Sequence, residues 1–183
     1  GTRTHLNIDY CNENIKTVYH ELFDEALERY NAKQIRSDRK IKDYYEKIRS
    51  SKQEKPFHEI ILQVGGKGNM NADTENGELA KQILDEYYQG FQERNPQLRV
   101  FSAHLHMDEA TPHLHIDFVP FTTGSKRGLD TRVSLKQALA TQGFKGGSRG
   151  DTEWSQWIQS EKEQLAAVME RYGIEWEHLG THE

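Results

Sequence analysis

Three histidines stand within one ten-residue stretch, His106-Met-Asp-Glu-Ala-Thr-Pro-His113-Leu-His115. Neutral imidazole is a common protein ligand for divalent metals, and three protein ligands leave coordination positions open for water or a substrate oxygen. An ion bound in this way acts as a Lewis acid on a carbonyl or phosphoryl group. The stretch therefore predicts a catalytic site for one divalent metal ion, bound by His106, His113 and His115.

The spacing of the histidines places them on one face of two strands, about residues 99–106 and 113–121. Side chains alternate between the two faces of a strand, so residues two positions apart share a face. The predicted imidazole-rich face contains Ser102, His104 and His106 from the first strand and His113, His115 and Asp117 from the second. The predicted apolar face contains Phe101, Ala103, Leu105, Leu114, Ile116 and Phe118.

The connector from Met107 to Pro112 is short enough for a hairpin, which makes the two strands antiparallel neighbours. His106 then lies across from His113 and near His115. Directly opposed residues have Cβ atoms about 4.5–5.5 Å apart, so their imidazoles can converge on one ion. A single histidine on a strand is usually exposed or hydrogen-bonded, but four histidines and an aspartate on one face have no use in a plain apolar core.

The histidine stretch, followed by Ile-Asp-Phe-Val-Pro-Phe, resembles the metal motif of the Mob/Pre (MobV-type) plasmid mobilisation and recombination relaxases. These relaxases are His-hydrophobe-His (HUH) endonucleases. The segment Arg3-Thr-His-Leu-Asn7 is similar to one found near the N-terminus of that family. The resemblance runs through most of the chain, and the complete motif is more specific than either half of it.

The resemblance implies an α+β fold in which helices flank a central antiparallel sheet. It also implies one Mn²⁺ or Mg²⁺ ion on His106, His113 and His115, with Glu109 activating the nucleophile or completing the site. The implied partner is plasmid origin-of-transfer DNA, partly single-stranded. One strand would be nicked by transesterification, which starts mobilisation and leaves a covalent protein–DNA link.

The nucleophile of the resembled family is a histidine in a His-Asn-x-Arg element upstream of the Arg-Thr-His-Leu-Asn segment. This sequence begins at Gly1 without that element, so we expect a single relaxase domain, residues 1–183, that lacks the family's extreme N-terminal part. His5 belongs to a different element and is not a substitute. Other HUH enzymes use tyrosine, but core roles are the better interpretation of the four candidate tyrosines. These are Tyr10, Tyr19, Tyr44 and Tyr45.

Basic residues concentrate in two stretches, although the formal net charge of the chain is −5. Residues 33–55 contain nine Lys/Arg against four acids, and residues 123–150 contain six against one. A solvated surface is the simpler interpretation on charge alone. With a metal site between them, the two stretches predict a path for the phosphate backbone on either side of the metal. The DNA-binding candidates in the second stretch are Lys126, Arg127 and Arg132.

Hydrophobic periodicity predicts helices over residues 13–31, 75–94, 134–141 and 152–173, and one more strand over 57–64. The spacing of apolar residues predicts that helical structure continues from Ile35 to Ile48. Thr152 and Gly173 have the residue types typical of an N-cap and a C-terminal cap. No run approaches the roughly 20 apolar residues of a membrane span, and with the single Cys11, expected to be a buried or half-buried thiol, a cytoplasmic protein is the default.

Two other function classes fit parts of the sequence. His104-Leu-His106-Met-Asp108 nearly matches a binuclear zinc motif of metallo-β-lactamase-type hydrolases, although Glu109 stands where that motif has its final histidine. A non-catalytic module that binds origin DNA and keeps its metal for structure is the other alternative. Two zinc ions per chain would identify the former, and metal-dependent DNA binding without a nick would identify the latter.

Overall fold

The two histidine-bearing strands lie at the centre of an antiparallel sheet in the computed structural model, which describes residues 6–65, 75–107, 111–174 and 178–182. The strand order is β1 (Ile8–Asn12), β3 (Leu98–His106), β4 (His113–Thr122), β2 (His58–Gly65) and β6 (His178–His182). A short strand, β5 (Arg132–Val133), pairs with the last residues of β4. The predicted α+β fold with a central antiparallel sheet is therefore confirmed.

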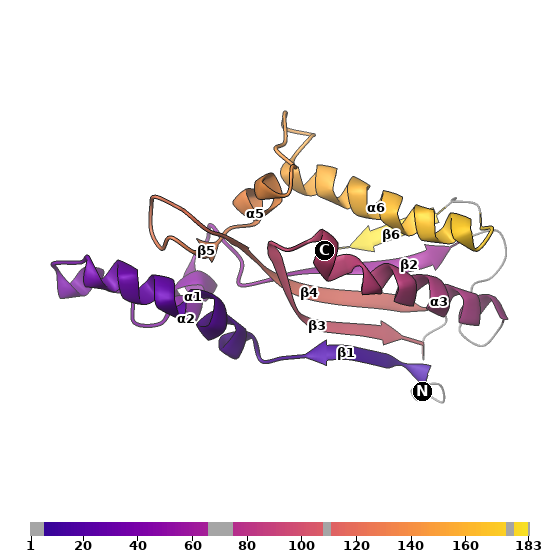
Figure 1. Ribbon diagram of the computed structural model, residues 1–183, viewed down its shortest axis with the longest axis horizontal. Helices are drawn as coiled ribbons and strands as arrows, with labels where there is room; N and C mark the ends of the chain where they lie inside the picture. Colours follow the sequence, from indigo (N-terminus) through magenta and orange to yellow (C-terminus); the bar gives the residue numbers. More distant parts are fainter. Residues whose placement is uncertain (1–5, 66–74, 108–110, 175–177, 183) are drawn as a thin grey trace.

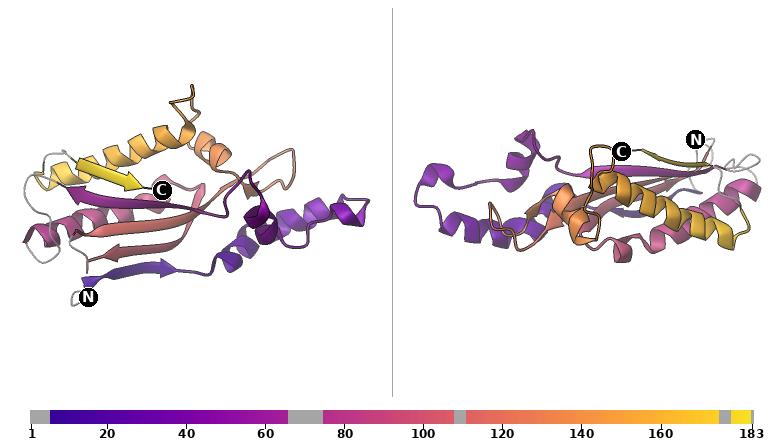
Figure 2. Two further views of the ribbon diagram at one scale, coloured as in Figure 1. Left: turned by 180° about the vertical axis from the view of Figure 1, so that it is seen from behind. Right: turned by 90° about the horizontal axis from the view of Figure 1, so that it is seen from above.

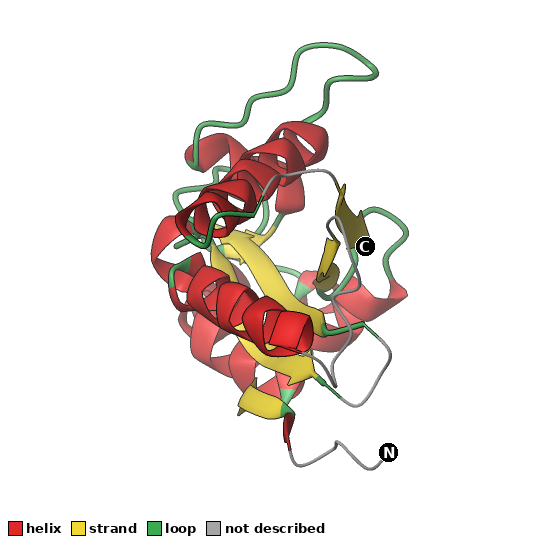
Figure 3. Ribbon diagram, turned by 90° about the vertical axis from the view of Figure 1, so that its right-hand side faces the viewer, coloured by secondary structure: helices red, strands yellow, loops and turns green. Residues whose placement is uncertain are grey.

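Helices cover one face of this sheet. They are α3 (Glu75–Gln89), α4 (Phe91–Arg94), α5 (Leu135–Thr141) and α6 (Glu153–Arg171). Their apolar residues pack with the inward residues of β2, β3 and β4 in the main hydrophobic core. Figure 1 shows α3 and α6 in front of the strands, and Figure 3 shows them against one side of the sheet. The opposite face carries the histidines, and the strands are seen from that side in the left view of Figure 2.

Two further helices, α1 (Ile15–Ala32) and α2 (Tyr44–Ser50), lie beyond one end of the sheet (Figures 1 and 2). They form a second apolar cluster with residues at the ends of β3 and β4, including Phe101 and Val119. A bidentate ion pair between Arg29 and Asp130 ties α1 to the loop that precedes β5, with both N–O distances 2.8 Å. This cluster holds the basic stretch of residues 33–55 against the loop after β4.

A buried carboxylate joins α4 to α6. The Glu161 side chain is only 4% exposed and accepts hydrogen bonds from Tyr87 Oη at 2.7 Å and from Arg94 Nη2 at 2.8 Å. Nearby, Trp157 Nε1 donates to Asn95 Oδ1 at 2.8 Å. Because a buried charge is costly without partners, these contacts fix the position of α6 on the sheet. In the described part of the chain, no helix is long and apolar enough to cross a membrane.

Several predicted elements differ from the structure. Residues between Ile35 and Ile48 form only a short 3-10 helix, Ser37–Arg39, and the beginning of α2, and Ile35 is fully exposed. The predicted helix 75–94 is interrupted at Gly90, which separates α3 from α4. A β-bulge between Val100 and Ser102 moves Phe101 out of the predicted apolar face and into the second cluster. The inserted residue breaks the alternation on which the prediction rested.

Candidate metal centre

The register of β3 and β4 confirms the predicted hairpin geometry. His106 pairs with His113, and His104 pairs with His115. The ring centroids of His106 and His115 are 4.8 Å apart, and those of His113 and His115 are 6.3 Å apart. The neighbours Leu105, Leu114 and Ile116 point into the main core. The strand pairing therefore gathers three imidazoles on the open face, near the end where β3 and β4 connect.

The donor set fits one divalent ion of the kind that binds imidazole. Metal–nitrogen bonds are about 2.0–2.1 Å long, so rings bound to one ion have their centres about 5 Å apart. The His106–His115 separation of 4.8 Å meets this requirement, whereas His113 has to turn toward His115. Among the described residues, no three His, Cys, Asp or Glu side chains are already arranged around an ion position. Glu109, the predicted acidic residue, lies outside the described residues.

His104 shares the face but has a different role. Its Nδ1 lies 2.7 Å from Asp9 Oδ1 on β1, and its Nε2 lies 3.0 Å from Ser102 Oγ. Both ring nitrogens therefore have hydrogen-bond partners, and a metal bond to either nitrogen would replace one of these hydrogen bonds. A binuclear site of the metallo-β-lactamase type needs His104 as a ligand, so this geometry does not favour that alternative.

A pair of carboxyl groups lies on the same face, one on β4 and the other on its neighbour β2. Glu59 on β2 is paired in register with Asp117 on β4. Burial, and then the hydrogen bond and negative charge of Glu59, raise the pKa of Asp117 to about 8. Repulsion between adjacent carboxylates and the loss of solvation both favour the protonated form of Asp117.

The four tyrosines weighed as nucleophiles are held away from the histidines. Tyr10 points to the helix-covered side, where it stacks on Tyr88 and donates a 2.5 Å hydrogen bond to Asp85. Tyr19 and Tyr44 are buried in the second cluster, where Tyr19 donates to the Pro56 carbonyl and Tyr44 accepts from the Val133 amide. Tyr45 packs edge-on against Tyr19, with ring centroids 5.1 Å apart. These are the predicted structural roles.

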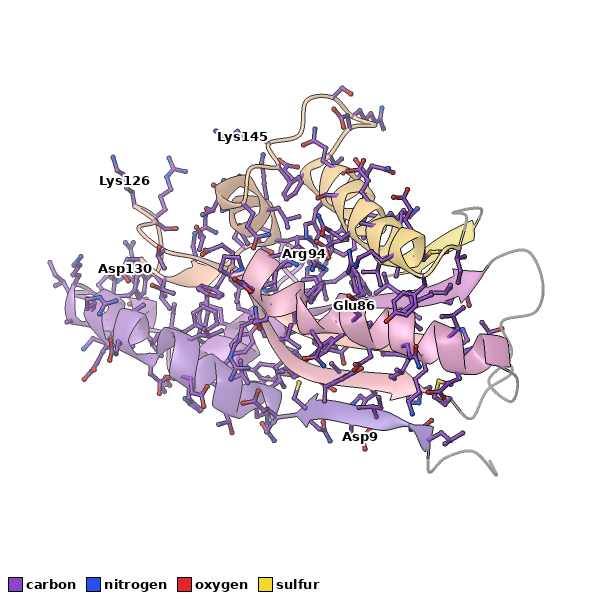
Figure 4. The ribbon with its side chains drawn as sticks, turned by 45° about the vertical axis from the view of Figure 1, so that its right-hand side comes forward. Asp9, Glu86, Arg94, Lys126, Asp130 and Lys145 are labelled. Carbon is purple, nitrogen blue, oxygen red and sulfur yellow. The ribbon has the colours of Figure 1, made fainter. Side chains whose placement is uncertain are left out.

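The DNA-binding candidates lie far from the histidines. Lys126 and Arg127 are exposed on the loop between β4 and β5, and Arg132 on β5 donates from Nε to Ser125 Oγ at 3.0 Å. Figure 4 shows Lys126 on the loop before β5 and Asp9, the partner of His104, well away from it on β1. Both basic stretches therefore begin beyond the end of the sheet where α1, α2 and β5 lie. The predicted arrangement, with one stretch on either side of the metal, is not what the structure shows.

The comparison with known families settles which proteins this chain resembles. The Mob/Pre family, described as plasmid recombination enzyme, matches residues 1–145. The chain belongs to this family. The resemblance read from the histidine motif is thereby confirmed. No protein of curated function matches the sequence.

Two solved structures of a MobM relaxase domain (MOBV; Mob/Pre) resemble this Mob/Pre chain. One is Mn-bound, with 22 nucleotides of plasmid pMV158 oriT DNA, and shows 20% sequence identity and a TM-score of 0.48 over 97% of this chain and 73% of that chain. The other carries the same DNA with a 3′-thiophosphate and shows 21% identity and a TM-score of 0.47 over 97% of this chain and 71% of that chain.

Three supporting residues of this Mob/Pre chain were not singled out from the sequence. Asp9 contacts a histidine 95 positions away, and nothing local to β1 signals that pairing. The Asn7 side chain accepts the backbone N–H of Met107 and so fixes β1 beside the end of β3. Glu59 could have been found, because it is the one carboxylate of its strand and alternates with Ile61 and Gln63.

Proposed function

We propose that this chain nicks one DNA strand at a plasmid transfer origin by transesterification, using one divalent ion bound by His106, His113 and His115. The observation that carries the proposal is the gathering of these three imidazoles on a sheet face that no described helix covers. Membership of a plasmid recombination enzyme family supports plasmid DNA as the substrate and the cytoplasm as the place of action.

In the proposed chemistry, a protein group attacks the phosphorus of the scissile phosphate and replaces the oxygen of one DNA strand end. A bound Mn²⁺ or Mg²⁺ would neutralise the charge that develops on the non-bridging phosphate oxygens. The three histidines would hold this ion, and Glu109 is our candidate for taking the proton of the attacking group. The free strand end leaves as a hydroxyl, and a covalent protein–DNA link remains. The nucleophile itself is not assigned to a residue of this chain.

The test is incubation of the chain with supercoiled plasmid that carries the candidate origin, in the presence of Mn²⁺. The same assay is run on the chain joined to a His-Asn-x-Arg element at its N-terminus. The extended chain should give nicked circles with protein attached to one strand end, the chain alone should nick slowly, and His113→Ala in the extended chain should abolish both products. Origin DNA bound without any nick would instead support the non-catalytic origin-binding module. Nicking that persists in His113→Ala, with melting curves that match the wild type, would contradict the proposed metal site.

A further inference from the structure

A cavity of about 410 Å³ lies at the end of the molecule away from the histidines. Its walls come from the last turn of α1, from α2 and the residues after it, and from the loop that leads into β5. The buried side chains of Ile48 and Leu129 form part of its lining. Cavities of this size accommodate small organic ligands. Neither the metal centre nor the proposed nicking step uses it.

The lining combines a flat apolar surface with positive charge. Tyr30 is half-buried at the cavity, and the ring of Tyr44 is buried behind it. Lys47 and Arg127 are exposed at the same cavity, and Arg132 contributes a third cation. Aromatic faces beside cations are the combination that binds an unstacked base together with its phosphates.

The acidic residue in this lining is Glu54. Three cations, Lys47, Arg127 and Arg132, line the same cavity against this one carboxylate. The cavity therefore keeps a positive balance of charge, which favours an anionic occupant over a cationic one.

A second cavity continues the positive surface. It shares Ser51, Gln53 and Glu54 with the first and adds Lys52, Lys55 and Lys136, and its volume is about 390 Å³. The ammonium groups of Lys52 and Lys55 therefore follow the first cavity along the chain segment after α2, and that of Lys136, which lies 4.0 Å from Glu153 Oε1, comes from α5. Phosphate binding needs this kind of extended local charge, because each neutralised phosphate releases counterions. An isolated small molecule would have no use for the second set of cations.

We propose that the first cavity receives one unpaired base of a DNA strand, stacked on Tyr30, while Lys47, Arg127 and Arg132 contact the phosphates on either side of it. The proposal rests on the proposed function for its substrate class, but on different residues. From His115 to Thr122, β4 spans about 23 Å at about 3.3 Å per residue. A strand that occupies both sites is therefore anchored several nucleotides away from the scissile phosphate.

The test compares two fluorescent octamers in buffer with EDTA: dT8 and an abasic octamer with the same sugar-phosphate backbone and no bases. Their charges match, so the ratio of their dissociation constants by fluorescence anisotropy reports base binding alone. We expect wild type to bind dT8 at least about fivefold more tightly than the abasic octamer. In Tyr30→Leu, which keeps an apolar side chain but removes the flat ring, this ratio falls close to one. In Tyr30→Trp it is retained.

Lys126→Ala is the matched control, because Lys126 neighbours Arg127 in the same loop but does not line the cavity. It weakens binding of both octamers equally and leaves their ratio unchanged. Photocrosslinking of an octamer that contains one 5-iodo-deoxyuridine, followed by peptide mapping, identifies Tyr30 independently of any variant. Equal affinity of wild type for the two octamers, or a ratio unchanged in Tyr30→Leu, would overturn the proposal. The assays contain no metal, so a failure of the nicking site does not affect them.

Discussion

The four histidines on one face of β3 and β4 differ in their surroundings, and each ring's neighbours determine the chemistry that is open to it. His104 is fixed by Asp9 and Ser102 through both ring nitrogens. The register brings His106, His113 and His115 onto one end of the same face, with the ring centroids of His106 and His115 4.8 Å apart. Alternation could predict the shared face from the sequence. It could not predict that Asp9, from a strand at the edge of the sheet, holds one of the four histidines by a hydrogen bond.

This difference predicts the metal affinity of single variants. His113→Ala should lower the affinity for Mn²⁺ at least about tenfold, because a mononuclear site with three protein ligands has no spare one. His104→Gln should leave the affinity within about twofold, since its ring nitrogens are already occupied by hydrogen bonds. Isothermal titration calorimetry measures both values. Equal losses in the two variants would show that His104 belongs to the metal site.

At the scale of the elements, the sequence predicted helix and strand boundaries best where a local signal, such as a capping residue, agrees with the tertiary structure. Thr152 accepts the Ser155 N–H and caps α6, and Gly173 has a positive φ of 73° just after the helix, as their residue types indicated. The edge strand β1 was not predicted, because five residues of mixed polarity carry little periodicity. The interruption at Gly90 and the bulge at Phe101 depend on contacts with other elements, which periodicity cannot report.

The buried network that joins α4 and α6 gives a prediction at this scale. Arg94→Ala should lower the free energy of unfolding by about 3 kcal/mol, because it removes the cationic partner of a buried carboxylate. Arg36→Ala breaks an ion pair with Asp38 in which both side chains are more than 60% exposed, so it should cost less than about 1 kcal/mol. Urea denaturation at neutral pH compares the two variants. Similar losses in both would mean that Glu161 is adequately satisfied by Tyr87 and Asn95.

At the scale of the whole molecule, the two proposed sites lie apart along the long axis of the chain. The histidines lie near the end of the sheet where β3 connects to β4, and the cavity and its cations lie beyond the other end. The two basic stretches are distant in sequence, and their juxtaposition depends on the Arg29–Asp130 ion pair and on the packing of α1 and α2, which composition could not reveal. A net charge of −5 is therefore compatible with DNA binding, because the positive charge is local.

The separation predicts how the salt dependence of DNA binding responds to charge removal. Lys126→Ala/Arg127→Ala should lower the slope of log affinity against log salt for single-stranded dT30 by about 1.4, because each lost phosphate contact contributes about 0.7. Arg132 is left in place, since its Nε is bonded to Ser125. The matched control Lys81→Ala/Lys162→Ala removes two cations from α3 and α6, on the helix-covered side, and should leave the slope unchanged. Anisotropy titrations across a range of salt concentrations measure both slopes. If the control lowers the slope as much as the loop variant does, Lys126 and Arg127 do not contact the DNA, and the salt dependence of binding follows only the net charge of the chain.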